Sequence, residues 1–155
     1  ITSRLVGSEM CIRDSSKTNS SRRRVNSLLY NVLMAGGIYN ATYFRNYPEE
    51  CDREGVLYGV ILVNKETFER ECIKVGIASG KDWRHVIKRS RGFRGYDLRI
   101  QRTYTSTLFH VWQIEQLLHE KYEHDKYSPK IKFGGHTECF KISSLILRDF
   151  PKNSS

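Results

Sequence analysis

Residues 55–78 read GVLYGVILVNKETFERECIKVGIA and contain the two runs that indicate the fold most strongly. The run 56–63 is almost continuously apolar, rich in β-branched side chains and of strand length. After the polar connector 64–70, the run 71–78 forms a second strand-like segment. Because the two runs are close in sequence, they are expected to pair as an antiparallel hairpin.

Lys74 interrupts the apolar character of the second run. Strand side chains alternate between faces, so Ile73, Val75 and Ile77 point to one face and Lys74 points to the other. A lysine is unexpected on a face that is simply core. It either reaches solvent from an edge strand or serves a function.

Three further elements follow the hairpin. Asp82 can cap a helix over 82–91, residues 97–105 alternate as a third strand would, and 106–123 have the pattern of a long helix. The sequence therefore predicts an α+β fold, in which a small three-stranded, largely antiparallel sheet is flanked by helices.

The long helix carries a carboxylate in its apolar row. That row comprises Leu108, Val111, Leu118 and Tyr122, and its missing middle position is Glu115. Burying a carboxylate costs several kcal/mol unless a cation or strong donors meet it. Glu115 is therefore either half of a structural salt bridge with an arginine or a functional group, and a functional role is favoured.

Charge and composition restrict the class of protein. The chain has 155 residues, enough for one domain with a proper core, and a formal net charge of +9. A basic chain favours nucleic acid as partner, with an acidic membrane surface as the competing interpretation. No apolar stretch is long enough to cross a membrane, and the four scattered cysteines predict reduced thiols in a cytoplasmic protein.

Composition also divides the chain. Residues 1–15 resemble translated sequencing adapter and are set aside as non-native. Residues 16–54 are expected to form a basic appendage, which includes an arginine triplet at 22–24 and a short helix at 25–34. Residues 55–150 are expected to form the functional domain.

The order of motifs in that domain resembles the GIY-YIG nuclease superfamily. Tyr58 stands where the first motif ends, and Lys74-Val75-Gly76 stands in place of Tyr-Ile-Gly. Arg84 follows Gly76 by eight residues, as in the family, and Glu115 occupies a later helix. Lysine in the second motif resembles a phage-borne and restriction-type branch, which often ends in a Glu-x-Phe strand like 138–140. Gly37-Ile38-Tyr39 spells the first motif literally but follows a helix-like segment and is interpreted as coincidence.

The resemblance implies a metal-dependent endonuclease that hydrolyses DNA. Glu115 would bind one Mg²⁺ or Mn²⁺ ion, and Arg84 would hold the phosphate. Tyr58 would orient the attacking water or accept its proton, a role for which a neighbouring cation must lower the phenol's pKa. Lys74 would supply that charge or contact the phosphate.

A basic segment after the second motif predicts the DNA-binding surface. Its members are Lys88, Arg89, Arg91, Arg94 and Arg99. They are interleaved with aromatic residues, which suits contact with a DNA backbone and stacking on bases.

Several alternatives stay open. Lys88 stands where relatives have histidine or tyrosine, and His85 could substitute for it. His119, one helical turn after Glu115, could share its metal ion, although no third ligand has a matching spacing. The whole chain could also be a non-catalytic DNA-binding module or an RNA-binding accessory protein. The oligomeric state is left open.

Overall fold

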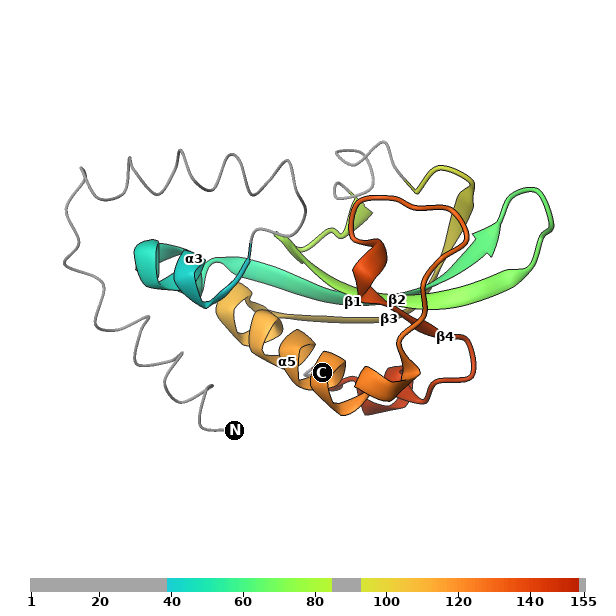
Figure 1. Ribbon diagram of the computed structural model, residues 1–155. Helices are drawn as coiled ribbons and strands as arrows, with labels where there is room; N and C mark the ends of the chain where they lie inside the picture. The colour runs from blue at the N-terminus through green and yellow to red at the C-terminus, as the bar shows by residue number, and fades with distance from the viewer. Residues whose placement is uncertain (1–38, 85–92, 154–155) are drawn as a thin grey trace. The chain divides into compact units, whose positions relative to one another are not determined.

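The computed structural model describes residues 39–84 and 93–153 (Figure 1). The chain divides into two compact units, Ile1–Arg53 and Glu54–Ser155. The first contains α3 (Ala41–Asn46), which begins where the Asn40 side chain accepts a 2.8 Å hydrogen bond from the Tyr43 amide. A short 3-10 helix, Pro48–Asp52, follows it. The expected helix at 25–34 and the arginine triplet lie outside the described residues.

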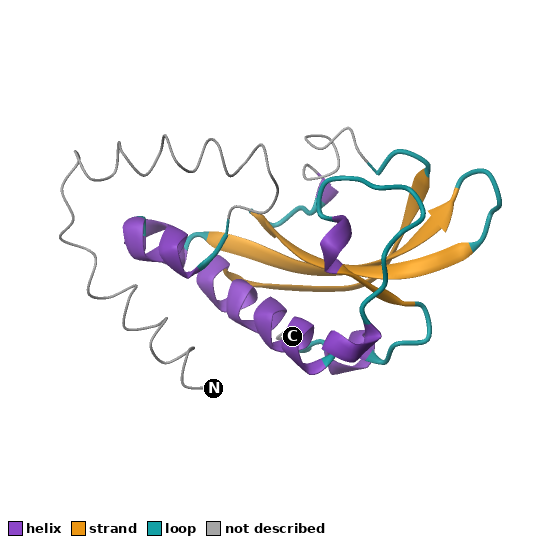
Figure 2. Cartoon of the chain, in the orientation of Figure 1, coloured by secondary structure: helices purple, strands orange, loops and turns teal. Residues whose placement is uncertain are grey.

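The second unit is built on a four-stranded antiparallel sheet (Figures 1 and 2). Its strands are β1 (Glu54–Asn64), β2 (Arg70–Ser79), β3 (Tyr96–Thr107) and β4 (Cys139–Lys141), in the order β3-β1-β2-β4. The expected β1–β2 hairpin is confirmed, with Tyr58 opposite Gly76 and Val60 opposite Lys74.

The prediction of three strands was wrong by one strand, β4. This strand has three residues, which is too short to show an alternating pattern in sequence. Its Cys139 and Phe140 are fully buried, and Cys139 pairs with Lys74. The Glu-x-Phe ending was therefore the sole sequence signal for the fourth strand.

Helix α5 (Leu108–Lys121) packs on one face of the sheet (Figure 2). It begins two residues later than the sequence suggested, because Thr107 caps it by accepting a hydrogen bond from the His110 amide at 3.2 Å. Against this face the backbone at Gly55 lies so close to the helix that a Cβ there would be 2.7 Å from Leu108 Cα. β1 is thus covered tightly by α5, which explains its continuous apolar character.

The opposite face is covered by aromatic side chains from the start of β3 and from the loops before β3 and β4. Phe93, Tyr96 and Phe133 pack together there, with the Phe93 and Phe133 ring centroids 4.9 Å apart. Val60 and Leu62 of β1 belong to the same cluster. Burial on both faces places the middle of β1 and β2 in the interior of the domain.

Only the start of the helix expected at 82–91 is described. The Asp82 side chain accepts a 2.9 Å hydrogen bond from the Arg84 amide, which is the capping contact predicted for Asp82. His85, Lys88, Arg89 and Arg91 lie outside the described residues. None of the described helices is long and apolar enough to cross a membrane.

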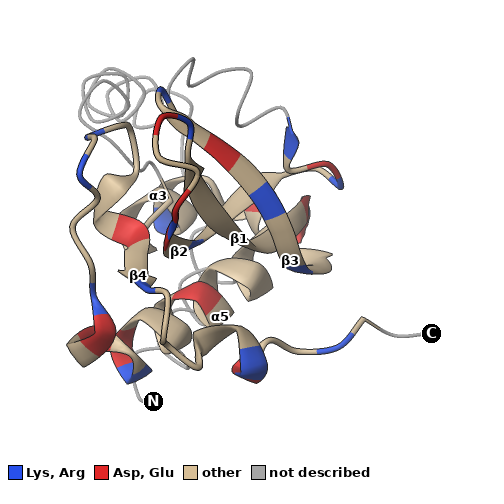
Figure 3. Ribbon diagram, turned by 90° about the vertical axis from the view of Figure 1, so that its right-hand side faces the viewer, with Lys and Arg blue, Asp and Glu red and all other residues tan. Residues whose placement is uncertain are grey.

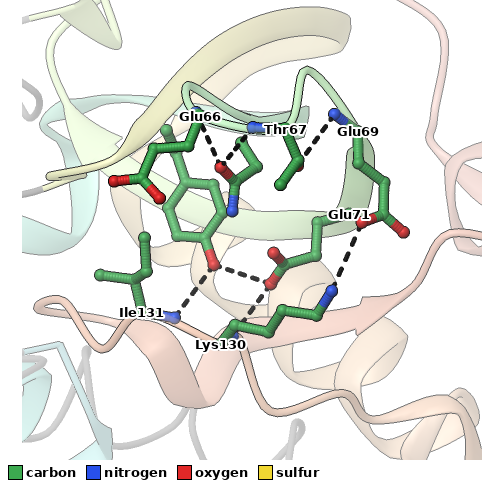
Figure 4. Close-up of polar contacts among 8 residues, drawn as sticks. Glu66, Thr67, Glu69, Glu71, Lys130 and Ile131 are labelled. Atoms are coloured by element: carbon green, nitrogen blue, oxygen red, sulfur yellow. Dashed lines mark hydrogen bonds and ion pairs between the residues drawn. The ribbon is translucent and has the colours of Figure 1, made fainter.

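A buried carboxylate ties the loop before β4 to the sheet (Figure 4). Glu71 Oε2 accepts hydrogen bonds from the Tyr96 hydroxyl at 2.7 Å and from the Lys130 amide at 3.0 Å. The Tyr96 oxygen in turn accepts one from the Ile131 amide. Burial alone would raise the pKa of Glu71, but these donors outweigh it and lower the pKa below the ordinary value of 4.5.

Replacing Glu71 with glutamine is expected to weaken the fold most at neutral pH. Because the folded-state pKa of Glu71 is depressed, its stabilisation is complete above the unfolded-state value and is lost as pH falls through the folded-state value. Urea unfolding at neutral and at acidic pH measures this difference. The stabilities of wild type and Glu71→Gln should converge on acidification, and a constant gap would contradict the assignment.

The tip of the β1–β2 hairpin is strained. Phe68 has φ of 61° and is 80 % exposed, so an aromatic residue occupies a left-handed conformation without burying its ring. The Asn64 side chain holds the turn by accepting hydrogen bonds from the amides of Glu66 and Thr67.

Phe68→Gly is expected to stabilise the protein. The left-handed conformation costs a non-glycine residue about 1–2 kcal/mol, while glycine loses about 0.5–1 kcal/mol of extra chain entropy. Chemical unfolding should therefore show a net gain of about 0.5–1 kcal/mol. Phe68→Ala, which removes the ring but keeps Cβ, is the control and should show no such gain.

Candidate active site

Tyr58 and Lys74 lie together on the face of the sheet opposite α5. The Lys74 Nζ atom is 5.7 Å from the centroid of the Tyr58 ring. Gly76, opposite Tyr58 in the register, leaves room for the phenol: a Cβ there would be 2.7 Å from the Tyr58 hydroxyl. Both side chains are buried. Lys74 therefore does not reach solvent from its face of the strand, and the site lies inside the domain.

Lys74 reaches a carboxylate that the sequence analysis did not assign. Its Nζ atom is 2.5 Å from Glu138 Oε2. Glu138 ends a 3-10 helix, His136–Glu138, directly before β4, and 29 % of its side chain is exposed. Gly135, with φ of 86°, precedes that helix, and a Cβ there would be 3.1 Å from Lys74 Nζ. Lys74 is therefore the buried half of the ion pair, and Glu138 is its partly exposed half.

Glu115 lies in the buried row of α5, as its spacing predicted. Leu108, Val111, Leu118 and Tyr122 are buried with it, and Glu115 itself is 5 % exposed. Its carboxylate accepts a hydrogen bond from the neighbouring Gln116 side chain at 3.1 Å. No lysine or arginine of the described part of the chain lies within 4.0 Å of it, so the structural salt bridge weighed for Glu115 is not found there.

The cluster perturbs the ionisation of Glu115. Burial raises the pKa of Glu115 well above its ordinary value, and the negative charge of Glu138 raises it further. Lys74 acts in the opposite direction without overcoming these effects. Glu138 and Lys74 therefore influence the pKa of Glu115 in opposite directions, and burial is the largest effect.

Tyr58 responds mainly to burial. Burial raises the pKa of the phenol, Lys74 lowers it, and the charges of Glu138 and Glu115 raise it again. Lys74 thus acts in the direction expected of a neighbouring cation, but the net pKa of Tyr58 is raised. Tyr58 is consequently a neutral hydroxyl at neutral pH, which favours orienting a water over accepting its proton.

His119 contacts the backbone at the edge of β2. Its Nε2 atom is 3.1 Å from the carbonyl oxygen of Val75, just beyond the point where β4 stops pairing, and its ring packs on Phe140. Burial lowers the pKa of His119, so the ring is neutral. Within residues 39–84 and 93–153, no group of three histidine, cysteine or acidic side chains could hold a metal ion. His119 therefore fastens α5 to the sheet edge.

Arg84 is not joined to the cluster. Its side chain is 70 % exposed and its nearest acidic partner is Asp82, 3.9 Å away. The neighbouring Trp83 has its ring centroid 6.3 Å from that of Tyr58. The structure thus places Lys74 beside Tyr58 and pairs it with Glu138, keeps Glu115 buried on α5, and leaves Arg84 exposed.

The described part of the basic segment is exposed. Arg94 lies in the loop before β3 and Arg99 lies on β3. Figure 3 shows that β3 carries acidic as well as basic positions, and the acidic one is Asp97. The expected basic surface is therefore interrupted on this strand.

The cysteines follow the expectation in part. Cys72 and Cys139 are buried free thiols on neighbouring strands, as expected of reduced cysteines. Cys51 is instead disulfide-bonded, which the scattered cysteine pattern did not predict. Cys11 lies outside the described residues.

Tyr58, Lys74 and Glu138 lie together and Glu115 adds a buried carboxylate on α5, so these residues offer carboxylate oxygens, one ammonium and one phenol. Carboxylate oxygens are the ligands that Mg²⁺ prefers, and this ion retains water molecules where the protein offers few groups. Comparison with known proteins adds no relative, because no family model, no curated protein and no solved structure matches the chain.

Proposed function

We propose that the chain is a metal-dependent endonuclease that hydrolyses phosphodiester bonds in DNA. The observation that carries the proposal is Glu115, a buried carboxylate without a counter-cation among the described residues. Structural carboxylates in protein interiors are normally paired or fully hydrogen-bonded, because leaving them unpaired costs several kcal/mol. A site that binds a cation explains why such a cost is retained.

The balance of charge supports a divalent cation. When ionised, the cluster contains one positive group, Lys74, and two negative ones, Glu115 and Glu138. With Glu115 ionised these groups would carry one uncompensated negative charge, which a bound cation would offset, whereas without a cation burial favours the protonated form of Glu115 and raises its pKa. Glu115 would hold Mg²⁺ or Mn²⁺, which when bound would offset charge on the scissile phosphate and the leaving oxygen.

The remaining residues supply orientation. Tyr58, neutral because burial raises its pKa, would position the attacking water through its hydroxyl group. Lys74 would stabilise charge that develops on the phosphoryl oxygens, since a fixed ammonium in a buried site needs no reorganisation. Arg84, which is exposed, would bind the phosphate as DNA approaches. Arg94 and Arg99 would contact the backbone further along.

The test is cleavage of supercoiled plasmid by the full chain, with Mg²⁺ or Mn²⁺ compared with EDTA. Glu115→Ala is the variant, and Glu120→Ala is its matched control because Glu120 is exposed on the same helix. Cleavage that needs the metal, is lost in Glu115→Ala and survives in Glu120→Ala would support the proposal. Equal cleavage by wild type and Glu115→Ala would refute it.

One observation favours the alternative, a non-catalytic DNA-binding module. Tyr58 and Lys74 are only 3 % and 2 % exposed, so the phenol and the ammonium are nearly closed to solvent. Under this alternative the cluster would be structural and the exposed basic residues would bind DNA. Binding that weakens steeply with salt, without cleavage of any plasmid or linear DNA, would decide for the module.

A further inference from the structure

We infer that Glu138 is a positioning residue of the proposed reaction, whose carboxylate fixes the Lys74 ammonium beside the Tyr58 phenol. This inference rests on the proposed function and concerns Glu138, which begins the Glu-x-Phe ending and to which the resemblance assigns no role.

The first observation in support is that the Lys74 side chain points into the domain. Lysine has a flexible four-carbon stem and would normally extend toward water. Lys74 is instead 2 % exposed, with Nζ 2.5 Å from Glu138 and 5.7 Å from the Tyr58 ring centroid. Its inward conformation needs a partner, and Glu138 is the acidic residue at ion-pair distance in the described part of the chain.

The second support is the space around the three polar atoms. Two glycines from separate segments leave that space open, and both are close to the same groups. A Cβ on Gly76 would be 2.7 Å from the Tyr58 hydroxyl and 3.3 Å from Glu138 Oε2. A Cβ on Gly135 would be 3.1 Å from Lys74 Nζ. Phenol, ammonium and carboxylate therefore share one small space bounded by backbone.

The third support is the register of the sheet. Cys139, the residue after Glu138, pairs with Lys74 across β2 and β4 and is fully buried. This pairing fixes the backbone of Glu138 beside the strand that carries Lys74. A purely structural ion pair would not need this arrangement, because buried pairs often contribute little net stability compared with apolar side chains.

The inference is tested first without catalysis, by fluorine NMR of protein that contains 3-fluorotyrosine. The chain has nine tyrosines, and Tyr58→Phe assigns the Tyr58 resonance. Glu138→Gln should shift that resonance, because Lys74 loses the partner that holds it near the ring. Glu123→Gln is the control, since it removes the same charge from an exposed pair with Lys126 at 3.5 Å. It should leave the Tyr58 resonance in place.

A double-mutant cycle shows whether Glu138 acts through Lys74. In a Lys74→Met background, adding Glu138→Gln should produce at most a minor part of the shift seen in wild type. An undiminished shift in that background, or no shift in Glu138→Gln alone, would overturn the inference. If the single variant Glu138→Gln does not fold, Lys74→Met and Lys74→Met/Glu138→Gln still test the inference, because a Tyr58 shift between them would show that Glu138 acts on Tyr58 without Lys74 and would overturn it.

The second readout is cleavage kinetics. Glu138→Gln should lower kcat by roughly 10- to 100-fold with little change in KM, as expected for a misplaced catalytic group. That loss should disappear in the Lys74→Met background. If the wild-type chain cuts no DNA, the proposed function fails, while the NMR cycle still decides whether Glu138 positions Lys74 on Tyr58.

Discussion

Replacing Glu115 with glutamine should make the protein more stable and abolish the proposed metal-dependent cleavage of DNA. The variant keeps the shape of the side chain and its hydrogen bond with Gln116 but removes a buried carboxyl group whose raised pKa shows that its charged form is unfavourable in the interior. Relief of that desolvation cost is worth about 1–3 kcal/mol. Loss of the proposed metal ligand removes several kcal/mol of transition-state stabilisation, on the order of 10³-fold in rate.

Thermal unfolding in EDTA and in Mg²⁺ measures the first effect. In EDTA the melting temperature of Glu115→Gln should exceed that of wild type. Added Mg²⁺ should raise the melting temperature of wild type, because a ligand that binds the folded state stabilises it, and should leave the variant unchanged. Glu120→Gln removes an exposed charge from the same helix and should behave as wild type. A variant that melts lower in EDTA would show that Glu115 is structural.

Gly76→Ala should reduce cleavage by about 100-fold although it adds one methyl group. That methyl would lie 2.7 Å from the Tyr58 hydroxyl and 2.9 Å from its Cζ atom, so the phenol must move. A displacement of about 1 Å at a reacting group can cost on the order of 10²-fold in rate. The effect should appear in kcat and match that of Tyr58→Phe in direction.

The matched control is Gly134→Ala. A Cβ at Gly134 meets no atom within 4 Å, so the same substitution is made in open space a short distance before Glu138. Cleavage by Gly134→Ala should equal that of wild type. If Gly76→Ala also cleaves DNA at the wild-type rate, the observed position of the Tyr58 hydroxyl is not required for cleavage.

The sequence predicted the hairpin, the third strand and the long helix because each has a repeating pattern of apolar residues. Glu115 was recognisable for the same reason, as a break in a regular apolar row whose burial the structure confirms. Lys74 was recognisable as a charge on an otherwise apolar strand. Patterns of this kind report which face of an element a side chain occupies.

Glu138 could not be assigned in this way. It lies in a short 3-10 helix beside a three-residue strand, and neither element is long enough to have a period. Its importance comes from a contact with Lys74, which is 64 residues earlier in the chain. The raised pKa of Tyr58 could not be predicted from the sequence either. The sequence shows that a cation, Lys74, is near and would lower this pKa, but it does not show the burial that raises it.

The site residues come from β1, β2, α5 and the residue before β4, and this separation along the chain affects the order of folding. Tyr58 and Glu138 are 80 residues apart (138 minus 58), and contacts between distant residues form late because closing a long loop costs entropy. The hairpin of β1 and β2 can form early, since its contacts are local. A partly folded chain would then contain the paired Tyr58 and Lys74 without Glu115 and Glu138 beside them. The proposed cleavage activity would therefore appear only when the whole domain has folded.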